Sequence, residues 1–239
     1  EAIDVGKTGI NFERHTVIGT AIINPLTVST PTLDATSITK VYDGTAVVKG
    51  NVANLSSQSS QLISGDAVNL AVIGFYADRH VGTNKTVTVN FALNGNDAQN
   101  YVLSANQVTG NYGSITQLNS VTYIGPVGGN WSSASNWAGG AIPDLSNVAN
   151  IIIPVGSAVS YDSGVLGPIT SQVTANGSMN LANAGGDLSF GGITGSGSIA
   201  LGGNNLTLSN AGSGNFSGSI SGSGGLTLAA GTQTLSGNN

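Results

Sequence analysis

Gly195-Ser196-Gly197-Ser198-Ile199-Ala200-Leu201 is followed, 27 residues further along the chain, by Gly222-Ser223-Gly224-Gly225-Leu226-Thr227-Leu228. At the same offset Leu208 corresponds to Leu235, and the residues between the apolar positions are mostly Gly, Ser, Asn and Thr. A unit of about 20 to 30 residues, built from short strands and Gly-rich corners, cannot bury its apolar face alone and is typical of a β-solenoid. The repeat therefore predicts coils stacked along an axis, which together form a rod.

The same offset predicts which side chains point into the stack. Ile193 corresponds to Ile220, so the two are expected on one inner face. The leucines expected in inward ladders are Leu201, Leu208, Leu228 and Leu235. We therefore expect residues 119–239 to form a β-helix with an entry cap followed by repeats.

The composition favours an extracellular all-β protein and excludes several classes of function. Gly accounts for 36 of 239 residues, and only 7% are charged, against about 25% in ordinary domains. Hydrophobic residues make up 39% of the chain, which is enough for a packed core. With 6 Lys and Arg and a net charge of −5, the chain is poorly suited to nucleic acid. Cysteine is absent, which excludes disulfides and Cys-based zinc sites, and no apolar run is long enough to embed the chain in a membrane.

Residues 25–118 show strand periodicity instead of the Gly-rich repeat. Val87, Val89, Phe91 and Leu93 alternate with polar or small residues, which indicates a half-buried strand. Turn signals separate several such runs, so we expect a β-sandwich of about seven strands. Residues 1–24 are expected to be the tail of a preceding β module, because their end resembles the end of the sandwich segment.

Two motifs in this region carry a family resemblance. Lys40-Val41-Tyr42-Asp43-Gly44-Thr45 and, about 55 residues later, Gly95-Asn96-Asp97-Ala98-Gln99-Asn100-Tyr101-Val102-Leu103 resemble the opening and closing strands of the YDG-type module of filamentous-haemagglutinin-like bacterial exoproteins. Residues 128–239 are similar to the repeats of autotransporter passenger domains. The resemblance implies a surface-exposed adhesin of a Gram-negative bacterium, with a YDG-like β-sandwich at 25–118 followed by a right-handed parallel β-helix. Tyr42-Asp43-Gly44 itself is expected to make a turn, with Gly44 at positive φ.

Both tryptophans of the chain lie where the Gly-rich pattern begins. Trp131 and Trp137 could form a stacking platform for a sugar ring, which makes them the candidate binding residues. The alternative is that they cap the open end of the β-helix and are buried there. The sequence favours the cap, since the pair precedes the first repeat.

Lys40, Asp97 and Asn100 suggest a covalent cross-link. Surface β-sandwiches can hold a Lys–Asn isopeptide bond, promoted by a buried carboxylic acid, and these residue types occur on the opening and closing strands. The alternative is a solvated lysine with two turn residues, a combination that arises easily by chance.

Catalysis is not expected. No Lys, Arg or His follows Lys85, and the later carboxylates, Asp144, Asp162 and Asp187, are scattered singly. A lyase or hydrolase on a β-helix would need clustered carboxylates with basic or calcium-binding partners. His80 has no ligand spacing and is expected at the surface. No metal and no cofactor is predicted.

These observations predict a fragment of a secreted bacterial surface adhesin that acts as a stalk or presentation rod in adhesion and biofilm. Its expected location is the extracellular side of the bacterial outer surface, and its expected partner is a glycan, a host or matrix surface, or another copy of itself. Two other functions are open: a self-assembling extracellular filament subunit, and a carbohydrate-binding module that uses an exposed Trp131–Trp137 platform.

Overall fold

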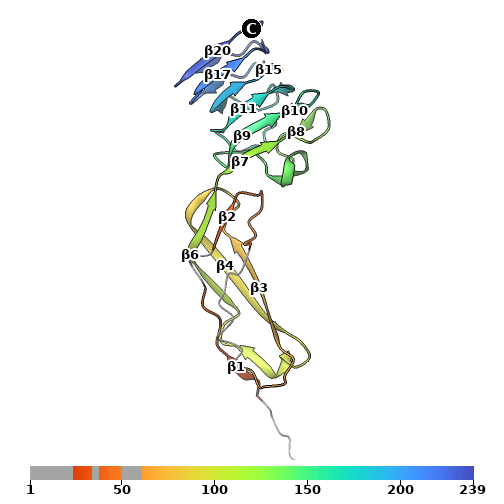
Figure 1. Ribbon diagram of the computed structural model, residues 1–239, viewed down its shortest axis with the longest axis vertical. Helices are drawn as coiled ribbons and strands as arrows, with labels where there is room; N and C mark the ends of the chain where they lie inside the picture. Colours follow the sequence, from red (N-terminus) through yellow and green to blue (C-terminus); the bar gives the residue numbers. More distant parts are fainter. Residues whose placement is uncertain (1–23, 34–37, 50–60) are drawn as a thin grey trace, which may run out of the picture.

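The computed structural model describes residues 24–33, 38–49 and 61–239. The predicted tail of a preceding module at 1–24 lies outside these residues except for Asn24. The described chain is elongated, with a β-sheet region and a stack of short strands following each other along the long axis (Figure 1). It is built from strands and short 3-10 helices, which confirms the all-β class.

The first region contains six strands among its described residues. They are β1 (Leu26–Val28), β2 (Thr39–Val41), β3 (Asn69–Tyr76), β4 (Gly82–Asn94), β5 (Tyr101–Leu103) and β6 (Gln107–Thr116), with the 3-10 helix η3 (Ala98–Asn100) before β5. Strands β2, β6, β4 and β3 form one sheet in that order, and β1 pairs with β5 in a parallel two-stranded sheet. The described residues thus form sheets of four and two strands, where the sequence predicted a sandwich of about seven.

The alternation read from the sequence sets the inner face of the four-stranded sheet. Val87, Val89 and Phe91 on β4 are buried, as expected. Antiparallel pairing of β3 with β4 runs from Asn69 opposite Asn94 to Tyr76 opposite Val87. Because side chains alternate along a strand, this register places Tyr76 on the buried face with Val87.

The second region consists of short parallel strands. They are β7 (Leu118–Thr122), β8 (Gly129–Asn130), β9 (Val148–Ile153), β10 (Ala158–Ser160), β11 (Gln172–Ala175), β12 (Ser178–Asn180), β13 (Leu188–Phe190), β14 (Gly192–Thr194), β15 (Ser198–Gly202), β16 (Leu206–Leu208), β17 (Ser213–Phe216), β18 (Ser219–Gly222), β19 (Leu226–Leu228) and β20 (Thr232–Leu235), with the 3-10 helices η4 (Ala134–Asn136) and η5 (Ala138–Gly140). They form four parallel sheets, in the orders β18-β15-β12-β10-β8, β14-β11-β9-β7, β13-β16-β19 and β17-β20. Over the described residues these sheets do not close into a solenoid.

The strand register corrects the predicted repeat. Ile199 pairs with Ile220 and Leu208 pairs with Leu228, so neighbouring strands in the repeat region are about 20 residues apart and not 27. The two similar heptads fall on β15 and β19, which belong to different sheets. Strands of every sheet need the same alternation of inward apolar and outward polar residues. Strands that belong to different sheets can therefore have similar sequences.

The predicted leucine ladders are half right. Leu201 and Leu208 are buried, whereas Leu228 is 46% exposed and Leu235 is 38% exposed. The exposed pair lies on β19 and β20, each of which ends the order of strands in its sheet. Leu201 and Leu208, by contrast, lie on β15 and β16, each of which has a described strand on both sides.

The strands on either side of Gln117 belong to different sheets, since β6 pairs with β4 and β2 while β7 pairs with β9. The predicted boundary between a module at 25–118 and a second one at 119–239 stays a prediction. Within the described ranges there is no helix with the length and apolarity needed to cross a bilayer.

Leu208→Ala should lower the free energy of unfolding by about 2–5 kcal/mol, because it opens a cavity in a closed-packed position. Leu228→Ala is the matched control on the paired strand, and its half-exposed side chain should cost about 1 kcal/mol or less. Denaturant unfolding of both variants measures the difference. Equal losses would contradict the buried position of Leu208.

Candidate functional site: the junction between the two regions

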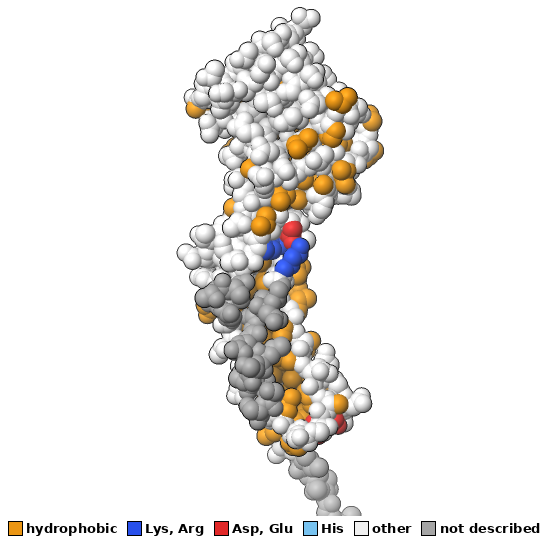
Figure 2. All heavy atoms as spheres, in the orientation of Figure 1, with side chains coloured by type: hydrophobic (Ala, Val, Ile, Leu, Met, Phe, Trp, Pro, Cys, Tyr) orange, Lys and Arg blue, Asp and Glu red, His pale blue; other side chains and the backbone are white. Residues whose placement is uncertain are grey.

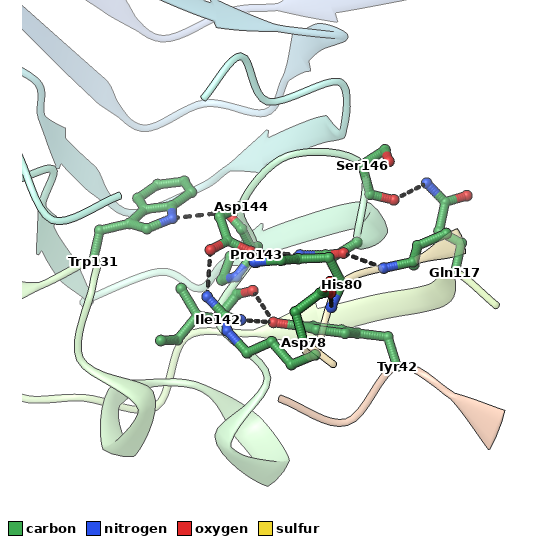
Figure 3. A network of polar contacts seen from close by, with 12 residues as sticks. Tyr42, Asp78, His80, Gln117, Trp131, Ile142, Pro143, Asp144 and Ser146 are labelled. Carbon is green, nitrogen blue, oxygen red and sulfur yellow. Dashed lines mark hydrogen bonds and ion pairs between the residues drawn. The ribbon is translucent and has the colours of Figure 1, made fainter. Parts of the chain in front are cut away.

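Tyr42 links the four-stranded sheet to the strand stack. It follows β2, its side chain is buried, and its hydroxyl donates a hydrogen bond to the carbonyl oxygen of Ile142 at 2.7 Å (Figure 3). The same hydroxyl accepts a hydrogen bond from the guanidinium of Arg79. Burial raises the pKa of the Tyr42 phenol above its usual value, although Arg79 acts in the opposite direction, so the hydroxyl remains a donor.

Arg79 also forms an ion pair with Asp144, which belongs to the second region. Asp144 is 1% exposed, and its other carboxylate oxygen accepts a hydrogen bond from Asn147 Nδ2 at 2.6 Å. A buried carboxylate is stable only when it is paired and hydrogen-bonded, and here both oxygens have partners. Space-filling atoms show a group of charged side chains at this waist of the molecule (Figure 2).

Asn147 ties the remaining parts of the junction together. It is fully buried, its Oδ1 accepts a hydrogen bond from the backbone N–H of Val81 at 2.9 Å, and its Nδ2 lies 2.9 Å from His80 Nδ1. Gln117 Nε2 donates to the carbonyl oxygen of Ser146 at 2.8 Å. His80, which was predicted to lie at the surface, is therefore a half-buried member of the junction.

The Tyr42-Asp43-Gly44 turn fits against the second region at its glycine. Gly44 has φ of +78°, as expected for the turn, and a Cβ at this position would lie 2.3 Å from the carbonyl oxygen of Gly140. Glycine is needed here both for the backbone conformation and for the close approach. All three residues of the motif thus have identifiable roles, since Asp43 accepts hydrogen bonds from Lys40 and Thr45 inside the turn.

Trp131 and Trp137 support the junction from the side of the strand stack. Both are buried, which confirms the prediction that they lie inside the start of the stack. Trp131 Nε1 donates to the carbonyl oxygen of Pro143 at 3.0 Å, next to Asp144, and Trp137 Nε1 donates to that of Trp131 at 2.6 Å. The two rings meet edge to face at a centroid distance of 4.9 Å. With their faces in the core, neither indole presents the platform that a sugar ring would stack on.

The structure does not bring Lys40 together with Asp97 and Asn100, the three residues considered for a cross-link. Lys40 Nζ lies 2.7 Å from Asp43 Oδ1 and donates to the carbonyl oxygens of Thr45 and Val47. Lys40 pairs with Ile115 on β6, and Ile115 pairs with Gly82, the first residue of β4. Asp97 and Asn100 come after the last residue of β4, so they lie roughly 40 Å from Lys40 along that strand. Asp97 instead accepts the backbone N–H of Ala67 at 2.7 Å, as a turn residue does.

The charges of the described residues serve local structure. Each of their Lys and Arg side chains has a carboxylate partner: Lys40 and Lys49 pair with Asp43, Arg79 with Asp144, and Lys85 with Asp78. Over the same residues, His, Cys, Asp and Glu side chains form no group of three or more that could hold a metal ion. The most organised polar arrangement among the described residues is therefore the junction.

A YDG domain is found at residues 24–109. This assignment rests on a match of that segment to the YDG domain family. The matched segment includes the Tyr42-Asp43-Gly44 turn and Arg79, and it ends inside β6. A search of curated proteins gives no match, and a search of solved structures gives none either. The YDG domain thus contributes Tyr42 and Arg79 to the junction, while Asp144 and Asn147 come from outside the matched segment.

Arg79, Asp144 and Asn147 were not predicted from the sequence to be partners. Arg79 and Asp144 are 65 residues apart, so no local motif joins them. The sequence does show that charged residues are scarce in this part of the chain, since Asp144 is one of only three carboxylates after residue 100. In a chain with so few charges, each remaining one is a candidate for a specific pair.

Gly44→Ala should lower the free energy of unfolding by more than the cost of placing alanine at a positive φ. Gly128→Ala is the matched control, since Gly128 has φ of +77° but no atom within 4 Å of an added Cβ. The control should cost about 1–2 kcal/mol for the left-handed backbone, and Gly44→Ala should exceed it by about 1 kcal/mol or more because of the clash with Gly140. Thermal or denaturant unfolding compares the two. Equal losses would argue against a tight contact at Gly44.

The Asp43 carboxylate should stabilise the protein in a pH-dependent way. Burial alone would raise its pKa, but hydrogen bonds from Lys40, Lys49 and Thr45 outweigh burial and hold the pKa well below its usual value. Because the pKa is lower in the folded state, this stabilisation is present above about pH 4 and is lost as the pH falls toward the folded value. As the pH is lowered from about 6 to about 2, the melting temperature of Asp43→Asn should fall less steeply than that of the wild type. Parallel profiles would contradict this role.

Proposed function

We propose that this chain works as a structural stalk in a secreted bacterial surface adhesin and holds other parts of the adhesin away from the bacterial outer surface. The observation that carries the proposal is the polar junction, in which Tyr42, Arg79 and Asp144 connect a YDG domain to an elongated strand stack. A spacer must resist bending between its parts. Paired buried charges and fully used hydrogen-bonding groups define one relative orientation, because every other orientation leaves a buried group unpaired.

We also propose that the strand stack is a right-handed parallel β-helix. Its support is the set of parallel pairs at intervals of about 20 residues, with ladders of apolar side chains such as Val159, Met179, Ile199 and Ile220. Stacked coils of this kind contact only their neighbours, so length can be added without changing the design. The low charge of the chain suits a passive rod whose expected partners are glycans or matrix surfaces.

The spacer role can be tested by measuring how rigidly the junction holds the two regions. The chain has no cysteine, so Thr109→Cys and Ser178→Cys introduce two spin labels, one on β6 and one on β12, without background. Double electron–electron resonance should give a narrow distance distribution. Adding Asp144→Asn should broaden it and lower the free energy of unfolding by about 3–5 kcal/mol, because Arg79 loses its buried partner.

Asp78→Asn is the matched control for that substitution. Asp78 pairs with Lys85 at 2.6 Å, but its side chain is 51% exposed, so its loss should cost about 1 kcal/mol or less and leave the distribution narrow. A broad distribution of distances between the labels when the junction is not mutated would contradict the proposed stalk role.

A second candidate is self-assembly into an extracellular filament. Strands β18, β19 and β20 each end their sheet, and Leu228 and Leu235 are exposed there. A strand edge with exposed apolar side chains can pair with another chain. Electron microscopy of the purified chain tests this, since filaments that disappear on Leu228→Lys would support assembly and a uniform monomer would oppose it.

A further inference from the structure

A groove of about 430 Å³ opens on the strand stack, and its lining includes neither Asp144 nor Asn147 of the junction. It lies between the loop that joins β10 to β11, residues 161–171, and the loop that joins β12 to β13, residues 181–187. Its size falls within the range of small-molecule sites, about 300–1,000 Å³. Apolar side chains form part of its walls, including Val165, Pro168 and Leu188.

Tyr161 supplies a polar group to this groove from a buried position. The residue is 5% exposed, and its ring packs against Trp131 at 5.2 Å and Phe190 at 6.3 Å between centroids. No group in the described part of the chain hydrogen-bonds its hydroxyl, which lies 4.0 Å from where a Cβ on Gly167 would stand, beside the groove. The oxygen itself is not closed off from solvent, so water or a ligand in the groove can hydrogen-bond with it. The aromatic cluster therefore fixes the position of a hydroxyl that can bond to a ligand in the groove.

Asp187 supplies an acceptor at the same groove. Its Oδ1 accepts the backbone N–H of Asn205 at 2.9 Å, and both of its oxygens lie 3.2 Å from Asn205 Nδ2. These hydrogen bonds hold the pKa of Asp187 below its usual value, so the group is a carboxylate at neutral pH. A carboxylate has about four acceptor positions, so capacity is left for a ligand.

The charges around the groove select the class of ligand. The sequence has no Lys, Arg or His after Lys85, so the groove offers no cation to a phosphate, sulfate or carboxylate. Asp187 is the one carboxylate among the lining residues, and Asn205 already shares it. A neutral sugar matches this lining, because its hydroxyls donate to Asp187 and exchange a hydrogen bond with Tyr161 while its C–H groups contact Val165 and Pro168.

We propose that this groove binds a neutral sugar residue of a glycan, with Tyr161 and Asp187 as the polar contacts. The site differs from the Trp131–Trp137 platform considered from sequence, since those indoles hold Tyr161 in place and do not meet the ligand. The inference does not depend on the stalk role, because the groove would bind sugar whether or not the junction is rigid.

Titration of the ¹⁵N-labelled chain with the methyl glycosides of glucose, galactose, mannose and N-acetylglucosamine tests the proposal. At least one glycoside should shift the amide signals of Gly185, Gly186 and Asp187 in a saturable way. Tyr161→Phe removes only a hydroxyl that has no protein partner, so its melting temperature should match the wild type while its affinity falls about fivefold or more. Asp187→Asn keeps an acceptor for Asn205 and should weaken binding about tenfold.

Tyr112→Phe and Asp97→Asn are the matched controls, since Tyr112 is exposed on β6 and Asp97 accepts a backbone N–H in a turn, both in the first region. Both should bind like the wild type. The proposal would be overturned if no glycoside shifts these amides, or if Tyr161→Phe and Asp187→Asn bind as tightly as the controls. It would also be overturned if N-acetyl-lysinamide binds in preference to every glycoside with an affinity that falls steeply with salt, because the groove would then be a cation site.

Discussion

The buried ion pair between Arg79 and Asp144 is the constraint on which the arrangement of the two regions depends. Asp144 is removed from water, and a carboxylate in that position is tolerated only with a cation and hydrogen-bond donors around it. Arg79 comes from the YDG domain, and Asn147 comes from the same loop as Asp144. Separating the regions would leave these groups unpaired or require their rehydration. The orientation of one region on the other therefore follows from satisfying a few polar atoms.

Aromatic packing extends this constraint into the strand stack. Trp131 holds the carbonyl oxygen of Pro143, next to Asp144, and its ring meets Trp137, Tyr161 and Phe190. Rigid rings in mutual contact transmit position well because the protein interior is close-packed. The same cluster that supports the junction thus also orients the Tyr161 hydroxyl at the proposed sugar groove. The junction and the groove thus share one set of supporting side chains.

The differences between expectation and structure have one physical origin. The 27-residue offset compared strands from different sheets, because a short alternating strand looks the same on any side of the stack. The proposed link from Lys40 to Asn100 assumed that opening and closing strands bring their residues level, yet the 13 residues of β4 separate them. The repeat identified strands correctly but not their neighbours, whereas Asp97 and Asn100 lie before and within η3 and not on the strand where they were expected. Pairing depends on contacts between residues far apart in the chain.

Residue chemistry alone determined the all-β class, the inward alternation on β4, the positive φ at Gly44 and the burial of the two tryptophans. These follow from local rules, since β-branched alternation, a turn glycine and large apolar rings behave alike in many folds. Tertiary structure alone decided the interval of about 20 residues between strands, the partners of Arg79 and Asp144, and the gathering of Tyr161 and Asp187 at one groove. No local signal records these, because each joins side chains whose distance in space is unrelated to their separation in sequence.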